Sequence, residues 1–360
     1  MKSQLPETPP APRPGAFKRK TVGLAREGLV RAEPLAGGGD LPLVVRPHVR
    51  HLDAAAWAGE SRDFIESRVR RHGGLLFRGF DLRTADDFAR FAAAAVGDDL
   101  LEYRERSSPR TRVEGNVYTS TDYPADQSIF LHNENSYQQT WPLRIFFFCR
   151  AAPPVGGETP IADCRRIFAR LGPRLRERFV ERRVMYVRNF GDGFGLPWQT
   201  VFQTADRRTV EEHCRRADIA AEWKEGDRLR TRAVRPAAAR HPRTGEAVWF
   251  NHATFFHVTT LPEGVRDELL AEFADAEELP TNSFYGDGAP IEPETLEELR
   301  EAYRRETVAF RWEAGDVLLL DNMLAAHGRA PYEGPREILV GMAAPHSWSQ
   351  VRLLETGECE

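Results

Sequence analysis

Two residues with metal-binding side chains, His132 and Glu134, lie two positions apart in the segment LHNENSY. If this segment is a strand, side chains at i and i+2 project from the same face, so an imidazole nitrogen and a carboxylate oxygen could converge on one ion. A third ligand must come from a distant part of the chain. His327 is the candidate because it follows an apolar strand and a short connecting segment, which predicts a place at the end of a strand.

Two histidines and one carboxylate would leave part of a metal's coordination sphere open. This facial arrangement is typical of non-haem Fe(II) oxygenases, whereas a closed set of four ligands is typical of structural sites. A bidentate 2-oxo acid could take two of the open positions and O2 the third. A His-x-Glu pair alone often occurs by chance, so the hypothesis depends on further residues.

A co-substrate such as 2-oxoglutarate would need a cation for its distal carboxylate. Arg336 lies nine residues after His327, at the start of the predicted strand REILVGM, and the turn PYEGP would bring it back beside the metal. An arginine fork suits a carboxylate. Thr159, on a predicted strand 25 residues after Glu134, could add a hydroxyl. Taken singly, Arg336 also fits a surface charge at a strand edge and Thr159 an ordinary strand residue.

The substrate-binding residues are less well defined by the sequence. Arg188 or Arg329 could pair with a substrate carboxylate, and His252 and His257 read as partly buried histidines near the site or as substrate contacts. The segment 282–292 contains glycines and is either a lid or a connecting loop. Each candidate also fits a structural hydrogen bond or ion pair, and the full set is Asn133, Asn135, Tyr137, Arg188, Trp198, Gln199 and Arg329.

The elements that must position these residues are mostly short strands. Residues 1–40 are rich in Pro, Gly and charge and predict a flexible arm. A single catalytic domain is predicted over 41–350, followed by a tail at 351–360.

Helices are predicted first, at 53–73 and 83–97 with Thr84 as a possible N-cap, around a short strand at 73–80. From about residue 115 short strands dominate, which indicates a mainly β sandwich or barrel with helices packed outside. The predicted strands are 128–137, 143–151, 158–163, 183–190, 247–251, 306–312, 316–322 and 336–344, and the predicted helical insertions are 164–182, 209–219, 264–278 and 295–306.

Composition limits the partners and the compartment. The chain of 360 residues has a formal net charge of −4, so no overall basic field points to nucleic acid. The four cysteines lack CxxC spacing and form no plausible disulfide framework, which favours the reducing cytoplasm. The start of the chain lacks the pattern of a signal peptide, and the apolar run 145–149 is too short to span a bilayer, so no membrane partner is expected.

The motifs together resemble the TauD/TfdA family of taurine-dioxygenase-like, Fe(II)/2-oxoglutarate-dependent oxygenases. The sequence similarity covers roughly residues 70–348. Five segments resemble the branch with SyrP-like amino-acid β-hydroxylases: STDYPADQSIFLHNENSYQQTWP, GGETPIAD, HPRTGEAVWFN, YGDGAPIE and GDVLLLDNMLAAHGRAPYEGPREILVGM. The resemblance implies a double-stranded β-helix, a cupin-like jelly roll with helical insertions. It implies Fe(II) on His132, Glu134 and His327, and 2-oxoglutarate on Arg336 and Thr159.

Two features depart from the family pattern. The carboxylate is Glu134 where the wider family usually has Asp, and the long interval from Glu134 to His327 implies an insertion between the ligand strands. Halogenases of this superfamily lack the carboxylate ligand, so Glu134 argues against halogenation.

The implied activity is hydroxylation, with O2 and 2-oxoglutarate, of an unactivated C–H bond in natural-product biosynthesis. The β-carbon of an amino acid, free or as an aminoacyl group on a carrier protein, is the implied position. Desaturation, epoxidation or cyclisation by the same cofactors is an alternative, and so is a non-catalytic jelly roll that binds a metal or small molecule. A zinc hydrolase is disfavoured because the chain has no HExxH and no nucleophile motif. The sequence does not indicate an oligomeric state.

Overall fold

Two facing β-sheets form the centre of the molecule. The computed structural model describes residues 26–37, 39–102, 110–121, 123–191 and 193–359. The larger sheet contains β1 (Val30–Pro34), β2 (Leu43–Pro47), β3 (Gly74–Phe77), β4 (Arg112–Glu114), β5 (Val117–Thr119), β7 (Thr140–Ala151), β17 (Val317–Asp321) and β20 (Glu337–Ser347). The smaller sheet contains β6 (Ile129–His132), β9 (Ile161–Asp163), β16 (Thr307–Val308) and β18 (Ala325–Arg329).

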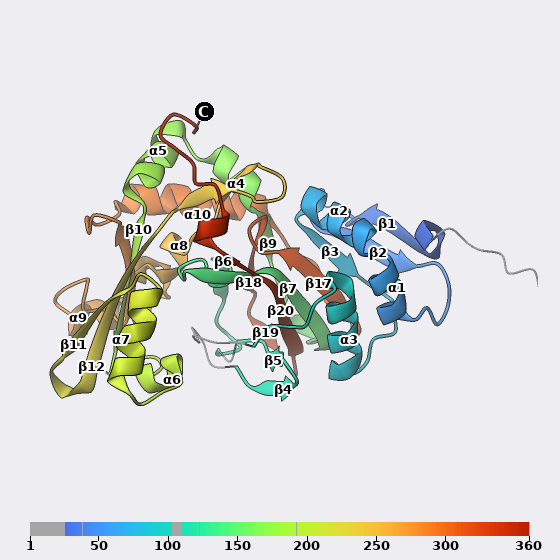
Figure 1. Cartoon of the computed structure of the whole chain (residues 1–360), viewed down its shortest axis with the longest axis horizontal. Coiled ribbons are helices and arrows are strands. Elements are labelled where there is room, and N and C mark those ends of the chain that lie inside the picture. The colour runs from blue at the N-terminus through green and yellow to red at the C-terminus, as the bar shows by residue number, and fades with distance from the viewer. Residues whose placement is uncertain (1–25, 38, 103–109, 122, 192, 360) are drawn as a thin grey trace, which may run out of the picture.

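The strand order confirms the double-stranded β-helix. In the larger sheet it is β1-β2-β3-β17-β7-β20-β5-β4, and in the smaller sheet β16-β9-β18-β6 (Figure 1). A two-stranded ribbon, β8 (Val155–Gly156) with β19 (Tyr332–Glu333), lies beside them. Strands far apart in sequence are neighbours here, so the fold can bring together ligands almost 200 residues apart.

Strand β7 explains why the run IFFFC is apolar at every position. Ile145, Phe147 and Cys149 belong to the core between the two sheets. Phe146 and Phe148 belong to a second core, under helices on the opposite face. A strand buried on both faces carries continuous apolar residues where a half-buried strand would alternate.

The helices over that second face are α1 (Ala54–Glu60), α2 (Arg62–His72) and α3 (Ala85–Val96), seen at the right of Figure 1. Thr84 is confirmed as an N-cap: its hydroxyl accepts from the Asp87 N–H, and the Asp87 carboxylate accepts from the Thr84 N–H. The single helix predicted over 53–73 is wrong, because Ser61 has φ −111° and ψ 23°, which ends α1 and starts α2.

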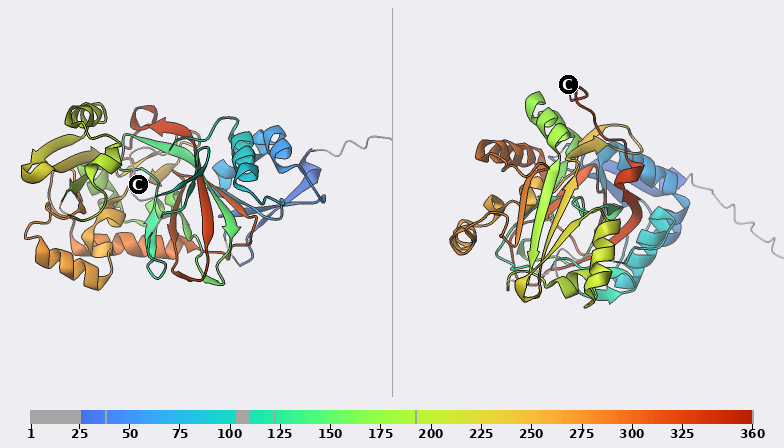
Figure 2. Two further views of the ribbon diagram at one scale, coloured as in Figure 1. Left: turned by 90° about the horizontal axis from the view of Figure 1, so that it is seen from below. Right: turned by 60° about the vertical axis from the view of Figure 1, so that its left-hand side comes forward.

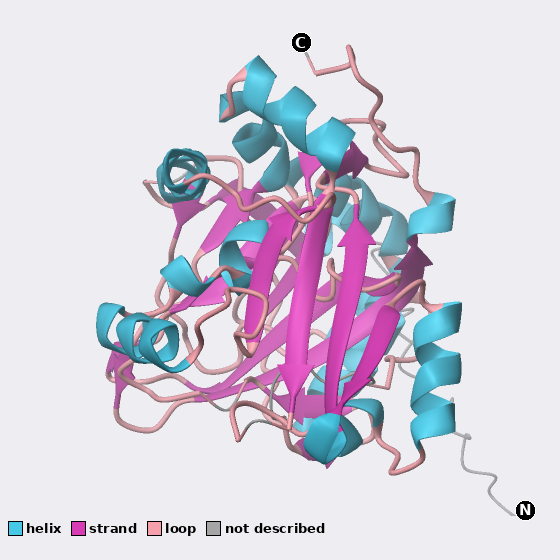
Figure 3. Ribbon diagram, turned by 90° about the vertical axis from the view of Figure 1, so that its left-hand side faces the viewer, coloured by secondary structure: helices cyan, strands magenta, loops and turns pink. Residues whose placement is uncertain are grey.

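A large insertion separates the ligand strands, as the long interval between ligands implied. It begins after β9 and runs to α10, and it carries its own sheet of order β11-β12-β10-β15, which lies beside the jelly roll (Figures 2 and 3). Its elements are α4 (Cys164–Arg170), α5 (Pro173–Arg182), β10 (Val184–Phe190), α6 (Trp198–Phe202), α7 (Arg207–Arg216), β11 (Ala220–Lys224), β12 (Arg228–Arg235), β13 (Ala238–Arg240), β14 (Ala247–Trp249), α8 (Ala253–Phe256), α9 (Glu263–Glu272), β15 (Thr281–Tyr285) and α10 (Pro293–Glu306).

Several predicted boundaries need correction. The predicted flexible arm 1–40 contains β1, which pairs along its whole length with β2, although residues 1–25 and 38 lie outside the described part. The possible lid at 282–292 starts inside β15, where Asn282 and Ser283 are buried, so that part is a sheet strand. Strands β7 and β20, of 12 and 11 residues, are longer than the short strands predicted.

The segment 351–360, predicted as a tail, packs against the insertion in its described part. The N–H of Arg240 donates to the carbonyl of Arg352 at 2.9 Å, and Leu353 forms a β-bridge with Ala239. A 3-10 turn, Trp348–Gln350, links it to β20, and another, Arg26–Leu29, precedes β1. Among the described residues, no helix combines the length and apolar character that crossing a bilayer requires.

Candidate functional site

The three predicted ligands lie together between β6 and β18. His132 and His327 face each other across this antiparallel pair, with ring centroids 4.5 Å apart. The Oε2 atom of Glu134 lies 3.9 Å from Nε2 of His327, and one ligand atom from each of the three residues falls within 4.8 Å of the others. The cluster therefore has the compactness that a single ion requires.

Two details of the sequence argument were wrong. β6 ends at His132, so Glu134 lies in the turn after the strand and not on the same strand face. His327 lies in the middle of β18 and not beyond the end of a strand. The tertiary structure, through the pairing of β6 with β18, accounts for the convergence.

Asn322 holds the turn that carries Glu134. Its Oδ1 accepts from the Glu134 N–H at 2.8 Å, and its Nδ2 donates to the carbonyls of Glu134 at 2.8 Å and Pro142 at 2.9 Å. All of these groups are buried, so the bonds form away from competing water. Asn322 directly follows β17, and this clamp ties the ligand turn to the centre of the larger sheet.

Arg110 contacts the carboxylate itself. Its Nη2 lies 2.8 Å from Oε2 of Glu134, and the two side chains are only 4% and 3% exposed. A buried, charge-assisted contact of this kind fixes the orientation of the carboxylate. Neither Arg110 nor Asn322 was identified from the sequence, because neither shares a motif with the ligands and their roles depend on contacts across the fold.

Both histidines are electronically suited to bind a cation. Nδ1 of His132 lies 2.9 Å from the Phe130 carbonyl, which fixes the proton there and leaves Nε2 as the lone-pair donor. Burial lowers the pKa of His132 and, with the nearby charge of Arg110, holds that of His327 well below its usual range. Two neutral imidazoles and one carboxylate form the donor set of the facial triad, so the residues fit an Fe(II) ion.

Arg336 and Thr159 lie in the same pocket as the two histidines, as predicted. The Arg336 guanidinium donates from Nε to the Gly157 carbonyl at 3.0 Å and from Nη1 to Ser120 Oγ at 3.3 Å. No described acidic residue forms an ion pair with Arg336. Burial lowers its pKa to about 10. This is a half-buried cation whose surroundings favour an incoming anion.

Thr159 is oriented as a donor toward this pocket. It lies in the loop before β9 and not on a strand as predicted. Its Oγ1 accepts from Nε1 of Trp312 at 3.2 Å, so the hydroxyl proton remains available for a carboxylate. Ser120 and Trp312 were further residues missed by the sequence analysis.

Most predicted substrate residues have structural roles. Asn133 donates to the Asn322 carbonyl at 2.7 Å, and Asn135 occupies a left-handed turn position with φ 57°. Arg329, although it lines the pocket, donates to the backbone carbonyls of Tyr123, Pro124 and Gln127. The backbone therefore holds Asn133 and Arg329, although Oδ1 of Asn133, Oδ1 of Asn135 and Nε of Arg329 have no partner among the described residues.

Trp198 and Gln199 belong to a different region. Trp198 is buried in a small core of the insertion and donates to the Asp227 carbonyl at 3.1 Å, and Gln199 donates to the Asp227 carboxylate at 3.2 Å. His257 caps the short turn at Val258–Thr260, and burial lowers its pKa to about 4. These three residues are not brought to the metal cluster.

His252, by contrast, lies beside it, and Tyr137 and Arg188 follow in a row. The His252 ring is 5.6 Å from that of His132, and the Tyr137 ring is 5.0 Å from that of His252. The Arg188 guanidinium carbon lies 5.6 Å from the centre of the Tyr137 ring. Ser136 Oγ holds Nδ1 of His252 at 2.5 Å. This row leads from a predicted metal ligand into the inserted sheet.

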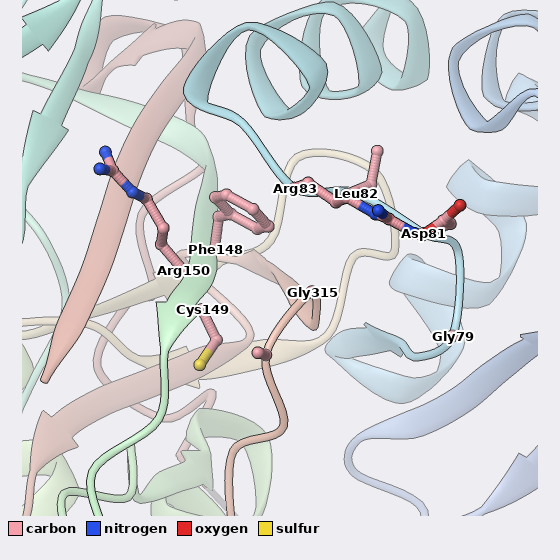
Figure 4. Close-up of a pocket in the computed structure, with 9 residues that line it drawn as sticks. Gly79, Asp81, Leu82, Arg83, Phe148, Cys149, Arg150 and Gly315 are labelled. Atoms are coloured by element: carbon pink, nitrogen blue, oxygen red, sulfur yellow. Dashed lines mark hydrogen bonds and ion pairs between the residues drawn. The ribbon is translucent and has the colours of Figure 1, made fainter.

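A separate pocket of about 460 Å³ lies between the β3–α3 loop, β7 and the turn before β17 (Figure 4). Its lining includes Cys149, and burial raises the pKa of that thiol to about 12, so it is not a ready nucleophile. Two arginines of the lining have exposed side chains that already pair with acids: Arg83 with Asp81, and Arg150 with Glu337. The Cys149 thiol and these two arginines therefore give this pocket neither a ready nucleophile nor an unpaired cation.

Comparison with known proteins gives one matching family model. The model described as "Taurine catabolism dioxygenase TauD, TfdA family" matches residues 34–343. Among curated proteins, the dapdiamide synthesis protein DdaC of Enterobacter agglomerans is 38% identical over 304 residues, 83% of this chain and 92% of DdaC. A clavaminate synthase-like protein of Arabidopsis thaliana is 31% identical over 291 residues, 78% of this chain and 84% of that protein.

Among solved structures, PvcB of Pseudomonas aeruginosa has a similar fold. The TM-score is 0.53 with 19% sequence identity, over 92% of this chain and 96% of PvcB. At this identity the likeness supports the fold alone.

Proposed function

We propose a hydroxylation reaction for this chain, which belongs to the TauD/TfdA family of Fe(II)/2-oxoglutarate-dependent dioxygenases. In this reaction the enzyme would hydroxylate an unactivated C–H bond of an amino-acid-like substrate. The β-carbon is the proposed position, and natural-product biosynthesis is the proposed setting. The similarity to a protein named for dapdiamide synthesis supports that setting. The observation that carries the proposal is the meeting of an open ligand triad with Arg336 and Thr159 in one pocket.

In this proposal His132, Glu134 and His327 hold the iron, and each has a partner that orients it. The Phe130 carbonyl sets the tautomer of His132, and Arg110 and Asn322 set the position of Glu134. Bound Fe(II), with 2-oxoglutarate and O2, supplies the oxidising chemistry of this enzyme family. The protein's own task is to position the ligands and the substrate.

Arg336 and Thr159 would receive the distal carboxylate of 2-oxoglutarate. The guanidinium is a half-buried planar fork held by Gly157 and Ser120, and the Thr159 hydroxyl already accepts a hydrogen bond from Trp312. Both groups therefore offer donors toward an anion without rearrangement. A dianion bound here would replace the missing charge partner of Arg336.

Aromatic side chains would keep water from the reacting centre. The Phe255 ring lies 4.5 Å from the His132 ring, and the Phe147 ring lies 5.0 Å from the His327 ring. A shielded site strengthens electrostatic interactions and limits side reactions. Glu134 occupies the position that a halide would need, which favours hydroxylation over halogenation.

The same cofactors could also give desaturation, epoxidation or cyclisation, and product mass separates the main cases. One oxygen atom is gained in hydroxylation, and two hydrogens are lost in desaturation. The substrate is either a free amino acid or an aminoacyl group on a carrier protein. Each described cysteine is an unpaired thiol, which supports a proposed place in the reducing cytoplasm.

The decisive experiment is anaerobic addition of Fe(II) and 2-oxoglutarate. We expect a weak visible charge-transfer band in the wild type and in a His48→Ala control, and no band in His132→Ala. Succinate release is then measured aerobically with amino-acid and carrier-loaded substrates. A wild type without the band and without succinate release would favour the alternative of a non-catalytic binding module.

A further inference from the structure

Arg188 lies at the far end of the row that runs from His132 through His252 and Tyr137, and no described residue provides it with an anion. It lies on β10, two residues from Tyr186, so the two side chains share one face of the inserted sheet. The Tyr186 hydroxyl accepts from the His252 N–H at 2.8 Å. Since the His252 ring is 5.6 Å from that of His132, this face of β10 is turned toward the metal cluster.

The surroundings of Arg188 are aromatic. Its guanidinium carbon lies 5.6 Å from the centre of the Tyr137 ring and 4.9 Å from that of Phe190. Its Nε is buried and has no hydrogen-bond partner among the described residues, and no described carboxylate forms an ion pair with it. Ring faces stabilise a cation and hold the plane of the guanidinium, but they leave its N–H donors open.

Two of the buried arginines of this protein are treated differently. Arg144 pairs with Asp321 at 2.5 Å, and Arg78 pairs with Asp316 at 2.5 Å. Burying a cation without an anion is costly, so such a group is retained where a ligand supplies the missing charge. The Arg188 side chain is half-buried, and its buried Nε lacks a partner among the described residues, so a ligand carboxylate would supply the missing charge.

The other arginines that face the metal cluster have assigned partners. Both terminal nitrogens of Arg329 donate to backbone carbonyls, although its Nε has no partner among the described residues, and Arg110 contacts Glu134. Arg336, on the jelly roll, suits the distal carboxylate of 2-oxoglutarate. Arg188 therefore remains for a second carboxylate, presented from the inserted sheet.

We propose that Arg188 binds a free carboxylate of the substrate, and that the enzyme therefore acts on an untethered amino acid. This inference rests on the proposed function and narrows it. An aminoacyl group on a carrier protein has its carboxyl carbon in a neutral thioester, which cannot accept a charged, bidentate pair from a guanidinium. The Tyr137 and Phe190 rings would then flank the bound carboxylate group.

The test compares substrates that differ only at the carboxyl group. L-Amino acids, their carboxamides and their N-acetylcysteamine thioesters are supplied to the holoenzyme, and succinate release is measured. We expect the wild type to prefer the free acids. Arg188→Gln should lower kcat/KM for the preferred acid by roughly ten- to a hundred-fold, mainly through KM, because a hydrogen bond to a charged group is lost.

Two further measurements separate a binding role from a structural one. Arg188→Gln should leave kcat/KM for the matching carboxamide nearly unchanged and should leave the Fe(II)–2-oxoglutarate band intact. Arg188→Lys keeps the charge and should recover part of the activity on the acid. Arg232→Gln is the matched control, since Arg232 lies on the opposite face of the same sheet and pairs with Glu277 and Glu222.

Several outcomes would overturn the inference. These are a wild type that uses acid and carboxamide equally, one that prefers the thioesters, and an Arg188→Gln variant with unchanged kcat/KM on the acid. If the band forms but no free acid releases succinate, the inference fails while the cofactor assignment stands. Absence of the band contradicts the proposed function itself.

Discussion

Replacing Asn322 with alanine should reduce both the stability of the protein and its affinity for iron. The side chain is fully buried and bridges three backbone groups: the N–H and carbonyl of Glu134 and the carbonyl of Pro142. Alanine removes every one of these bonds. The turn that carries the carboxylate ligand would then lose its connection to the end of β17.

The size of the effect follows from the number of partners left behind. A buried polar group that loses its hydrogen bond costs about 1–3 kcal/mol, so three such groups give a loss of at least about 3 kcal/mol in the free energy of unfolding. Groups that orient metal ligands typically affect metal affinity by roughly 10- to 100-fold. We expect Fe(II) binding to weaken within that range, because Glu134 is no longer held in position.

The assay combines thermal unfolding of the metal-free protein with anaerobic Fe(II) titration. Asn189→Ala is the matched control, because the Asn189 amide donates to the carbonyls of Glu277 and Leu279 at 2.7 Å and accepts from Arg230. It should lower the melting temperature to a similar degree but leave iron affinity unchanged. If both variants bind iron like the wild type, or if both lose affinity equally, the clamp on Glu134 is not what positions the ligand.

The remaining predictions concern the ligands, the co-substrate pocket and pH. His327→Ala should abolish succinate release at any 2-oxoglutarate concentration, and wild-type-like release would contradict the proposed metal site. Gly157→Ala should raise the KM for 2-oxoglutarate, because the residue has φ 72° and a Cβ there would lie 2.5 Å from Pro153 Cγ and 3.0 Å from Arg336 Cδ; an unchanged KM would refute this. Burial raises the pKa of Asp321, but the charge of Arg144 outweighs it and brings the value down to about 2. This folded-state pKa lies below the unfolded value of about 3.9. The stabilising contribution of the Asp321 carboxylate should therefore be complete above pH about 4 and disappear as the pH falls toward 2. Acid unfolding curves of the wild type and Asp321→Asn should converge in that window.

Local chemistry made part of the fold readable from the sequence. The Thr84 cap and the apolar run of β7 depend on neighbours within a few residues or on burial of a whole segment, and both were predicted correctly. Boundaries that depend on partners elsewhere were not. The strand β1 has exposed and polar residues and is ordered by its pairing with β2, so its composition suggested a flexible arm.

The same division applies to the site. Residue types and order were enough to nominate His132, Glu134, His327, Arg336 and Thr159, because metal and carboxylate chemistry restricts which side chains can serve, and the structure brings these side chains together. The sequence could not place Arg110 or Asn322, nor separate Arg188 from Arg329 as a carboxylate ligand. Those distinctions depend on which polar groups are already satisfied, and that is decided only when β6, β17 and the inserted sheet are packed together. The sequence by itself determined the candidate reacting groups of this protein, because residue type and order limit the possible chemistry, whereas the tertiary structure decided their orientation and which cations remain open to a ligand.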